Sequence, residues 1–412
     1  RLLKISPATL YSYVSRGLLV SEPVPAGGNR ERRYPAEDIV RLKERQEIRR
    51  HPEKAAERAL FQGSPVLTSS ITQLDEKAFY YRGRNVLQLA KEGWPIESVA
   101  LLLWLDRDLE SARLESDALF RSGAISTRLV LSLARTAGLS TIQRFASALP
   151  SAEASDVTAH DLRPAVAALT GARIFRLLVA IASAESTAQV PTAVALQRAW
   201  APRRPEAAAL INAALVLCAD HELDAAALAA CAAASTGATP YSAVAAGLAS
   251  GSGPGHIGGC LHAEALITEL LGCRRTGPDA FRAFIAGKLK SGNGVPRFGH
   301  PIYPKGDPRA SVLFELLQKV RPRSSVIRRA VEFTRTVEEV TGLRPRVDIP
   351  LAAMAAEFSF APGTATTLYT LARVIGWIAH AIEQYETDRI IRPRARYIGK
   401  TKVSRPDASV TI

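Results

Sequence analysis

Three histidines stand in surroundings that suggest chemistry rather than core packing. The triplet Asp220-His221-Glu222 places one of them between two acidic residues, in an Ala-rich stretch that we expect to be helical. The glycine-rich segment 253–259 places His256 at a predicted helix start, where backbone can approach a ligand and free N–H groups favour anions. The loop 295–303, bounded by proline and glycine, has His300 at its centre. We therefore take these histidines as candidates for a functional site.

A carboxylate and an arginine join these candidates. Asp348 is the one charged residue of the apolar stretch 347–350, where a carboxylate can act as a general base near neutral pH. Asp307-Pro308-Arg309 follows the loop that holds His300. Taken singly, each candidate could equally be a capping, core or salt-bridge residue. Their order along the chain therefore carries the functional interpretation.

The spacing of the reactive residues disfavours three other kinds of site. No histidine pair has the His-x-x-x-His spacing of a helical zinc site and no Cys-x-x-Cys pair occurs, so we expect no metal. No Gly-x-Ser-x-Gly turn indicates a serine hydrolase. The glycines of 251–259 follow a predicted helix, whereas a dinucleotide site needs a preceding strand. The cysteines are expected to be small buried hydrophobes of a reduced cytoplasm: Cys218, Cys231, Cys260 and Cys273.

Length and composition set broad limits. A chain of 412 residues with 47% hydrophobic residues exceeds one usual core, so we expect two or more globular domains. We expect no transmembrane helix and find no signal peptide, which favours a cytoplasmic location. The single methionine is Met354, so we expect further residues before Arg1. The net charge of +14 is spread along the chain and does not decide the function.

Apolar residues at spacings of three and four predict helices through most of residues 61–412, and strand signals are few. The clearest predicted helices lie around 86–90, 96–103, 207–214 and 371–378. We therefore expect an all-α core.

Residues 1–60 form a small unit with 13 Lys and Arg against 8 Asp and Glu. A helix start at Ser6-Pro7, a basic strand-like piece at 30–34 and a second helix opening with Glu37-Asp38 follow one another. This pattern resembles the winged helix-turn-helix domain of the mercury-resistance regulator family. The resemblance implies DNA contacts from a helix in the major groove and from a wing on phosphate. The matching residues are Thr9, Tyr11, Tyr13, Arg16, Arg32, Arg33 and Tyr34. A docking domain without DNA affinity is the alternative.

The motifs of residues 65–400 together resemble the citrate synthase family. The matching segments, in chain order, are Ser69-Ser70-Ile71-Thr72, Tyr81-Arg82-Gly83, Asp220-His221-Glu222, Gly253-Pro254-Gly255-His256, Phe298-Gly299-His300, Asp307-Pro308-Arg309, Val347-Asp348, Arg373 to His380, and Arg392-Pro393-Arg394. One such motif is weak. The six motifs from Asp220 to Arg394, with Phe298-Gly299-His300 and Asp307-Pro308-Arg309 counted as one loop, are in register and make the resemblance specific.

The resemblance implies a role for each matched residue. Asp348 would remove a proton from the methyl group of acetyl-CoA, and His256 would donate a hydrogen bond to the thioester oxygen. His300 would polarise the ketone of oxaloacetate. The carboxylates of oxaloacetate would be held by His221, Arg309, Arg373 and Arg392. The adenine of CoA would lie against Val295, Pro296, Phe298 and Gly299. No metal and no permanently bound cofactor would be needed.

Three departures from the family pattern lie beside these residues. Asp224 stands where the family often has Asn. After His256, the segment Ile257-Gly258-Gly259-Cys260 stands where the family usually has Gly-Gly-Ala-Asn, and Ile257 and Cys260 could change how CoA or the helix sits. Arg297 replaces a glycine before the Phe-Gly-His motif, where it could strain a tight turn or add a phosphate contact. We expect these changes to affect efficiency and acyl-CoA preference more than the class of reaction.

The resemblance also implies an architecture. A large helical domain, residues 61–257 and 366–412, would be interrupted by a small domain, residues 258–365. The two would close over a cleft that excludes water. The subunits would form a homodimer or a hexamer, with Arg392 entering the partner's site. Arg373 and His380 are seven residues apart and should share a helix face.

Three functions remain open at this point. The protein could condense acetyl-CoA with oxaloacetate to citrate, or propionyl-CoA to 2-methylcitrate. It could instead be a DNA-binding regulator that senses oxaloacetate or an acyl-CoA through an inactive synthase fold. It could also do both.

Overall fold

The computed structural model separates the chain into two compact units, Arg1–Ser69 and Ser70–Ile412. The structure describes residues 10, 13, 14, 19, 21–23, 32–34, 67–75, 78–121, 130, 132, 136, 138–184, 190–290, 294–387, 389–395 and 399.

Short pieces of the first unit are described. Leu10, Tyr13 and Val14 are helical, and Leu19 is buried. Strands β1 (Glu22–Pro23) and β2 (Arg32–Arg33) pair antiparallel as a two-stranded ribbon. The predicted DNA-contact residues Thr9, Tyr11 and Arg16 lie outside the described residues.

The second unit opens with a small antiparallel sheet in the order β3-β4-β5. Its strands are β3 (Thr72–Leu74), β4 (Phe79–Tyr81) and β5 (Arg84–Asn85). Phe79 and Tyr81 are fully buried and pack edge to face, so the sheet is anchored on the helices beneath it. These strands qualify the all-α expectation, because the unit is mostly helical with one short sheet.

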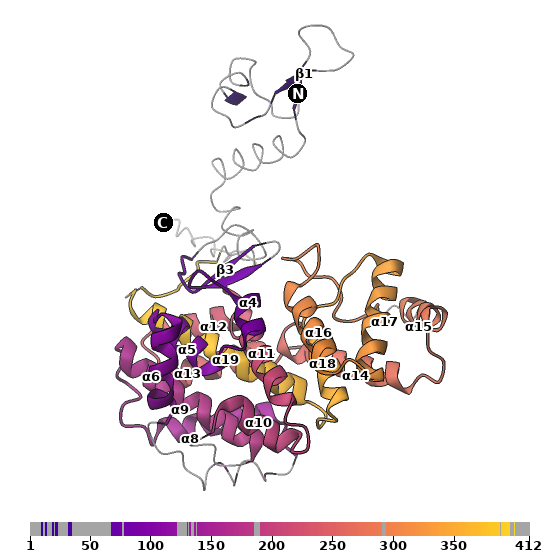
Figure 1. The fold of residues 1–412 in the computed structure, drawn as a ribbon. Coiled ribbons are helices and arrows are strands. Elements are labelled where there is room, and N and C mark those ends of the chain that lie inside the picture. Colours follow the sequence, from indigo (N-terminus) through magenta and orange to yellow (C-terminus); the bar gives the residue numbers. More distant parts are fainter. Residues whose placement is uncertain are drawn as a thin grey trace, which may run out of the picture. The chain divides into compact units, whose positions relative to one another are not determined.

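Helices make up most of the second unit, and the four periodic stretches predicted above are all helical (Figure 1). The first part of the unit contains α4 (Val86–Glu92), α5 (Ile96–Leu105), α6 (Leu109–Arg121), α8 (Thr141–Glu153), α9 (Pro164–Ser183), α10 (Thr192–Trp200), α11 (Ala207–Cys218), α12 (Ala225–Ala234) and α13 (Pro240–Gly251). A 3₁₀ turn, η1 (Ile257–Gly259), leads into α14 (Cys260–Gly272), α15 (Pro278–Lys290), α16 (Pro308–Val320), α17 (Ser325–Thr341), α18 (Asp348–Glu357) and α19 (Thr364–Tyr385).

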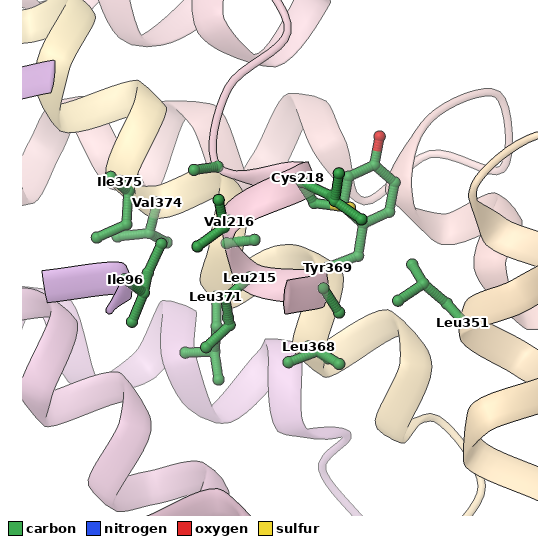
Figure 2. Packing of buried hydrophobic residues seen from close by; sticks show 14 of the residues in the cluster. Ile96, Leu215, Val216, Cys218, Leu351, Leu368, Tyr369, Leu371, Val374 and Ile375 are labelled. Carbon is green, nitrogen blue, oxygen red and sulfur yellow. The ribbon is translucent and has the colours of Figure 1, made fainter. Parts of the chain in front are cut away.

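Helix α19 is the central element of this unit. Every residue from Thr364 to Ile382 is buried, because the helix packs against α5, α9, α11, α12, α13 and α18. Figure 2 shows Leu371, Val374 and Ile375 of α19 packed with the apolar side chains of α11. A helix that is buried on all sides makes a rigid base for the polar residues it carries.

Helices α14 to α18 pack on one another and gather on one side of the unit in Figure 1. Phe298 contributes to their core, with its ring edge to face with that of Phe333 at 6.2 Å. Among the described residues, one helix, α9, is long and apolar enough to cross a membrane by length and composition alone, which is weak evidence against the expectation of no transmembrane helix. It is nevertheless mostly buried, since it packs against α5, α6, α8, α10, α13 and α19. Such burial is typical of a core helix in a soluble protein.

Candidate active site

A buried acidic turn forms the floor of the site. Asp220 and His221 lie in the connection between α11 and α12, so the expectation that they are helical is wrong. The hydroxyl of Tyr81 donates to the backbone carbonyl of Asp220 at 3.0 Å, and the hydroxyl of Thr72 donates to its carboxylate at 2.6 Å. The small sheet therefore fixes this turn, which is the structural reason for the motif in the opening segment.

Helix α19 brings two basic side chains to the same carboxylate. Arg373 Nη1 lies 3.1 Å and His380 Nε2 lies 3.2 Å from Asp220, which confirms that these two residues share a helix face. Gly376 lies between them, and a Cβ there would stand 2.3 Å from an oxygen of Asp220. Only glycine lets the helix approach so closely.

Two neutral histidines and a tyrosine form an aromatic cluster above this floor. The His221 and His300 rings lie 5.5 Å apart, and Tyr303 is bonded to His221 Nε2 at 3.0 Å. Burial, aided by the positive charge of Arg309, lowers the pKa of His300 to about 4 and that of His221 well below its ordinary value. His300 Nδ1 accepts the Ile302 N–H, so the ring proton is on Nε2 and is available to a ligand oxygen.

The start of helix α16 ties an arginine to the segment that carries the candidate base. Asp307 caps α16, binds the guanidinium of Arg309 through two bonds of 2.9 Å, and accepts the N–H of Val347 at 3.0 Å. Val347 directly precedes Asp348. The arginine and the base are therefore held by one buried carboxylate.

Asp348, the first residue of α18, is in contact with two further groups. Its Oδ1 accepts from Arg297 Nη2 at 2.8 Å and from the Cys260 thiol at 3.0 Å. Burial, followed by the charge of Asp348, raises the pKa of the Cys260 thiol well above its ordinary value, so the sulfur stays protonated as a donor. Arg297 has φ of +65°, which glycine adopts readily and arginine rarely. The Arg297 carbonyl accepts the N–H of Arg346 at 3.0 Å, and this backbone bond helps to hold Arg297 in its strained conformation.

His256 is also engaged at both ring nitrogens. Nδ1 accepts the Ile257 N–H at 2.8 Å, and Nε2 lies 3.0 Å from Asp224 Oδ2. The same oxygen lies 2.9 Å from Arg373 Nη2, while Asp224 Oδ1 caps helix α12. Burial would raise the pKa of Asp224, but Arg373 and His256 outweigh it and hold the pKa far below the ordinary value.

These contacts join most of the predicted site residues into one connected set. His221, His256, His300, Arg309, Asp348 and Arg373 all belong to it. Arg392 is exposed on the segment after α19 and makes no hydrogen bond or ion pair with the described residues of this set. Of the residues expected to bind CoA, Phe298 lies in the core and the Gly299 N–H bonds to the carbonyl of Arg344. Val295 and Pro296 are half-buried in the loop before them.

Sequence reasoning did not assign three members of the set to the site. Asp224 and Arg297 were visible only as departures from the family pattern, and Tyr303 only as part of the His300 loop. An aspartate before an Ala-rich run is a typical N-cap, which could have placed Asp224 at the start of α12. Nothing in the sequence indicates that Arg297 turns back toward Asp348.

The site contains buried guanidinium N–H groups that have no acceptor. In the site, Arg297 Nε, Arg309 Nη1 and Arg373 Nε are buried and have no hydrogen-bond partner, as is also true elsewhere in the described residues of the Nε atoms of Arg82, Arg144, Arg204 and Arg329. A buried unpaired donor costs about 1–3 kcal/mol, more when charged. Three such donors around neutral histidines therefore indicate a site for a small anion with several carboxylate oxygens.

Comparison with known proteins gives this arrangement a family. The family model for the C-terminal domain of citrate synthase matches residues 60–394. The chain belongs to the citrate synthase family. Its fold is similar to that of citrate synthase from Thermotoga maritima, with 25% identity, a TM-score of 0.69, and coverage of 84% of this chain and 96% of that one. A ternary complex of the Thermoplasma acidophilum enzyme with carboxymethyl coenzyme A and oxaloacetate has the same fold, at 22% identity and a TM-score of 0.70 over 84% of this chain and 97% of that one.

Curated relatives match this citrate synthase family member over shorter stretches. "Citrate synthase 2" of Bacillus subtilis is 32% identical over 194 residues, which is 46% of this chain and 51% of that protein. "2-Methylcitrate synthase 2" of Corynebacterium glutamicum is 29% identical over 192 residues, which is 45% of this chain and 48% of that protein. The aligned part of the chain spans about half the length of these relatives. Among the described residues, no group of three or more His, Cys, Asp or Glu could hold a metal.

Proposed function

We propose that the protein condenses acetyl-CoA with oxaloacetate and water to give citrate and CoA. The observation that carries the proposal is the set of buried, unpaired guanidinium N–H groups beside the neutral His300 and next to Asp348. A C4 dicarboxylate with a ketone supplies the anionic oxygens and the acceptor that these groups lack. CoA enters and leaves as a co-substrate, and no permanently bound cofactor takes part.

Each of the described site residues can be given a separate role in the proposed reaction. Arg309, Arg373 and His221 would bind the carboxylates of oxaloacetate, and His300 Nε2–H would polarise its ketone. Asp348 would take a proton from the acyl methyl group. Because Arg297 and Cys260 both bind Oδ1 of Asp348, Oδ2 is the oxygen left for that proton. The loop with Val295, Pro296, Phe298 and Gly299 would cover the CoA adenine.

The finer features of the assembly are part of the same proposal. We propose a cytoplasmic homodimer in which the large domain, 61–257 and 366–412, closes on the small domain, 258–365. Arg392 would complete the partner's oxaloacetate site, which suits its exposed position in the described segment. Propionyl-CoA is the alternative acyl donor, and the relative named 2-methylcitrate synthase supports it.

We propose in addition that residues 1–60 are a winged helix-turn-helix domain that binds DNA. The antiparallel ribbon of β1 and β2 carries Arg32 and Arg33 on one strand, as a wing on phosphate would require. A mobility-shift titration on the upstream DNA at two salt concentrations, with and without oxaloacetate, tests this idea. Binding should weaken steeply with salt and be lost in Arg32→Ala/Arg33→Ala. No shift at micromolar protein in low salt would leave residues 1–60 as a docking domain.

Release of free CoA measures the proposed reaction directly. Purified protein is mixed with oxaloacetate and either acetyl-CoA or propionyl-CoA, and the thiol is followed with time. Release that depends on oxaloacetate, with citrate or 2-methylcitrate as the product by mass spectrometry, would establish the reaction and the acyl donor. Tight oxaloacetate binding by calorimetry without any CoA release would instead favour a sensor that uses an inactive synthase fold.

A further inference from the structure

A second cavity, with a lining separate from the candidate active site, has a volume of about 560 Å³. Its walls come from the start of α8, the end of α13, the turn η1, the start of α14 and one side of α19. Of its lining residues in the described part of the chain, none is assigned to oxaloacetate, acyl-CoA or proton transfer. The apolar part of the lining consists of Leu139, Ile142, Leu248, Ile257, Leu261 and Pro362. A cavity of this size and lining is typical of a site for a small organic molecule.

The indole N–H of Trp377, which lines this cavity, has no acceptor among the described residues. The chain has four tryptophans, and the other three donate hydrogen bonds: Trp94, Trp104 and Trp200. Trp377 is fully buried, where an indole N–H usually finds a partner. Its ring lies against α13, and Cζ2, on the same side of the ring as Nε1, is 3.6 Å from the position of a Cβ on Gly251. Gly251 also lines the cavity, so we infer that the free N–H lies at the cavity wall.

The hydroxyl of Thr366 on the same helix is unpaired as well. Thr364, Thr367 and Thr370 each donate to a backbone carbonyl one turn back along α19. Thr366 lines the cavity and is 6% exposed, but its hydroxyl has no partner in the described part of the chain. A buried hydroxyl without a partner is unfavourable. A ligand in the cavity would supply the missing partner.

Arg144 brings a positive charge to the cavity from the first turn of α8. Its guanidinium donates to the carbonyl of Thr136 at 3.2 Å and forms no ion pair with a described carboxylate. The N-terminus of α8, which also lines the cavity, favours an anion. The N-terminus of α19 is already occupied, because Glu264 accepts the N–H groups of Gly363 and Ala365. The anionic end of a ligand therefore belongs beside Arg144.

The cavity also touches both places where the chain passes between the proposed domains. Ile257 and Gly258 lie on either side of the first boundary, and both line the cavity. Gly363 and Thr366 lie on either side of the second boundary and line it too. A molecule in the cavity contacts both passages, so its affinity depends on how the two domains are arranged.

We propose that this cavity binds a monocarboxylic acid with an apolar body, and that its occupancy changes the affinity of the active site for oxaloacetate. The carboxylate would accept hydrogen bonds from Arg144, Thr366 and Trp377, while the body would lie against the apolar lining. The site goes beyond the proposed condensation, and binding does not depend on that reaction. The coupling rests on the proposed oxaloacetate site and on the proposed division into two domains.

Octanoate is a suitable probe, titrated into the full chain labelled with fluorotryptophan and followed by fluorine NMR. The Trp377→Phe variant assigns the Trp377 signal. We expect octanoate to move that signal to saturation while the signals of Trp94 and Trp200 stay in place. Octanamide lacks the charge and acetate lacks the apolar body. Each should therefore bind at least about tenfold more weakly than octanoate.

Matched substitutions separate this site from non-specific binding. Arg144→Gln should weaken octanoate binding by about tenfold or more, because it removes a hydrogen bond between charged groups. Thr366→Val should weaken it by about three- to tenfold. Without octanoate, Thr366→Val should melt at the parent's temperature or above it, because the variant loses an unpaired buried hydroxyl. Thr370→Val changes the same wall in the same way but removes a hydroxyl that is bonded to its own helix, so octanoate affinity should stay within about twofold.

Calorimetry with oxaloacetate, with and without saturating octanoate, measures the coupling. The affinity for oxaloacetate should change by about fivefold or more, and the affinity for octanoate must change by the same factor in the reciprocal titration. An unmoved Trp377 signal, or equal octanoate affinities in Thr366→Val and Thr370→Val, would overturn the site. Octanoate binding that leaves the affinity for oxaloacetate unchanged would overturn the coupling. A protein that binds octanoate at this site but releases no CoA would support the site and contradict the proposed condensation.

Discussion

Replacing Asp220 by Asn should destabilise the second unit without removing any residue that the mechanism assigns to substrate. The carboxylate is fully buried and lies within 3.2 Å of Arg373 Nη1, His380 Nε2 and the Thr72 hydroxyl. Breaking a buried ion pair costs about 3–5 kcal/mol, because the remaining charge stays buried without its partner. At about 2.1 cal/mol/K of unfolding entropy per residue, a unit of roughly 340 residues should lose about 4–7 °C in melting temperature.

Thermal and urea unfolding of the parent and Asp220→Asn measure this loss. Burial would raise the pKa of Asp220, but His380 and Arg373 outweigh it and lower the pKa below its ordinary value. A lowered carboxyl pKa contributes stability above the unfolded value of about 3.9 and loses it as the pH falls through the folded value. Because this range lies above the unfolded carboxyl pKa, the deficit should persist throughout pH 8 to pH 5. Removing both charges in Asp220→Asn/Arg373→Met should cost less than the sum of the single changes. If the melting temperature of Asp220→Asn lies within 1 °C of that of the parent, the buried Asp220 ion pairs do not stabilise the unit as argued here.

Three further outcomes are expected. Asp348→Asn should abolish CoA release while calorimetry still shows oxaloacetate binding, because the carboxylate acts on the acyl group alone; turnover within tenfold of the parent would contradict its role as base. A chain cut before Arg392, mixed with Arg373→Ala, should regain activity in hetero-dimers if Arg392 acts in the partner's site, and confirmed hetero-dimers without activity would exclude that. Burial lowers the pKa of His300 to about 4, so between pH 6.5 and pH 4 the unfolded chain binds a proton that the folded chain does not. The free energy of unfolding should therefore fall as the pH falls through this range. In urea titrations, His300→Gln should show a shallower fall than the parent.

The helices of this protein were predictable because each follows from a local pattern. Periodic apolar residues gave α4, α5, α11 and α19, and the seven-residue spacing of Arg373 and His380 gave their shared face. The Asp220 turn was assigned wrongly because helix propensity of the neighbouring alanines masked a connection that tertiary bonds from Tyr81 and Thr72 hold open.

The identity of the site residues could be predicted, whereas their partners could not. The order of the motifs singled out Asp348 and His256, since residue type and sequence position are enough for that. Which group each one faces depends on side chains that arrive from distant segments. Asp224 and Arg297 lie about 30 and 50 residues from the side chains they bind, and only the folded backbone brings them together.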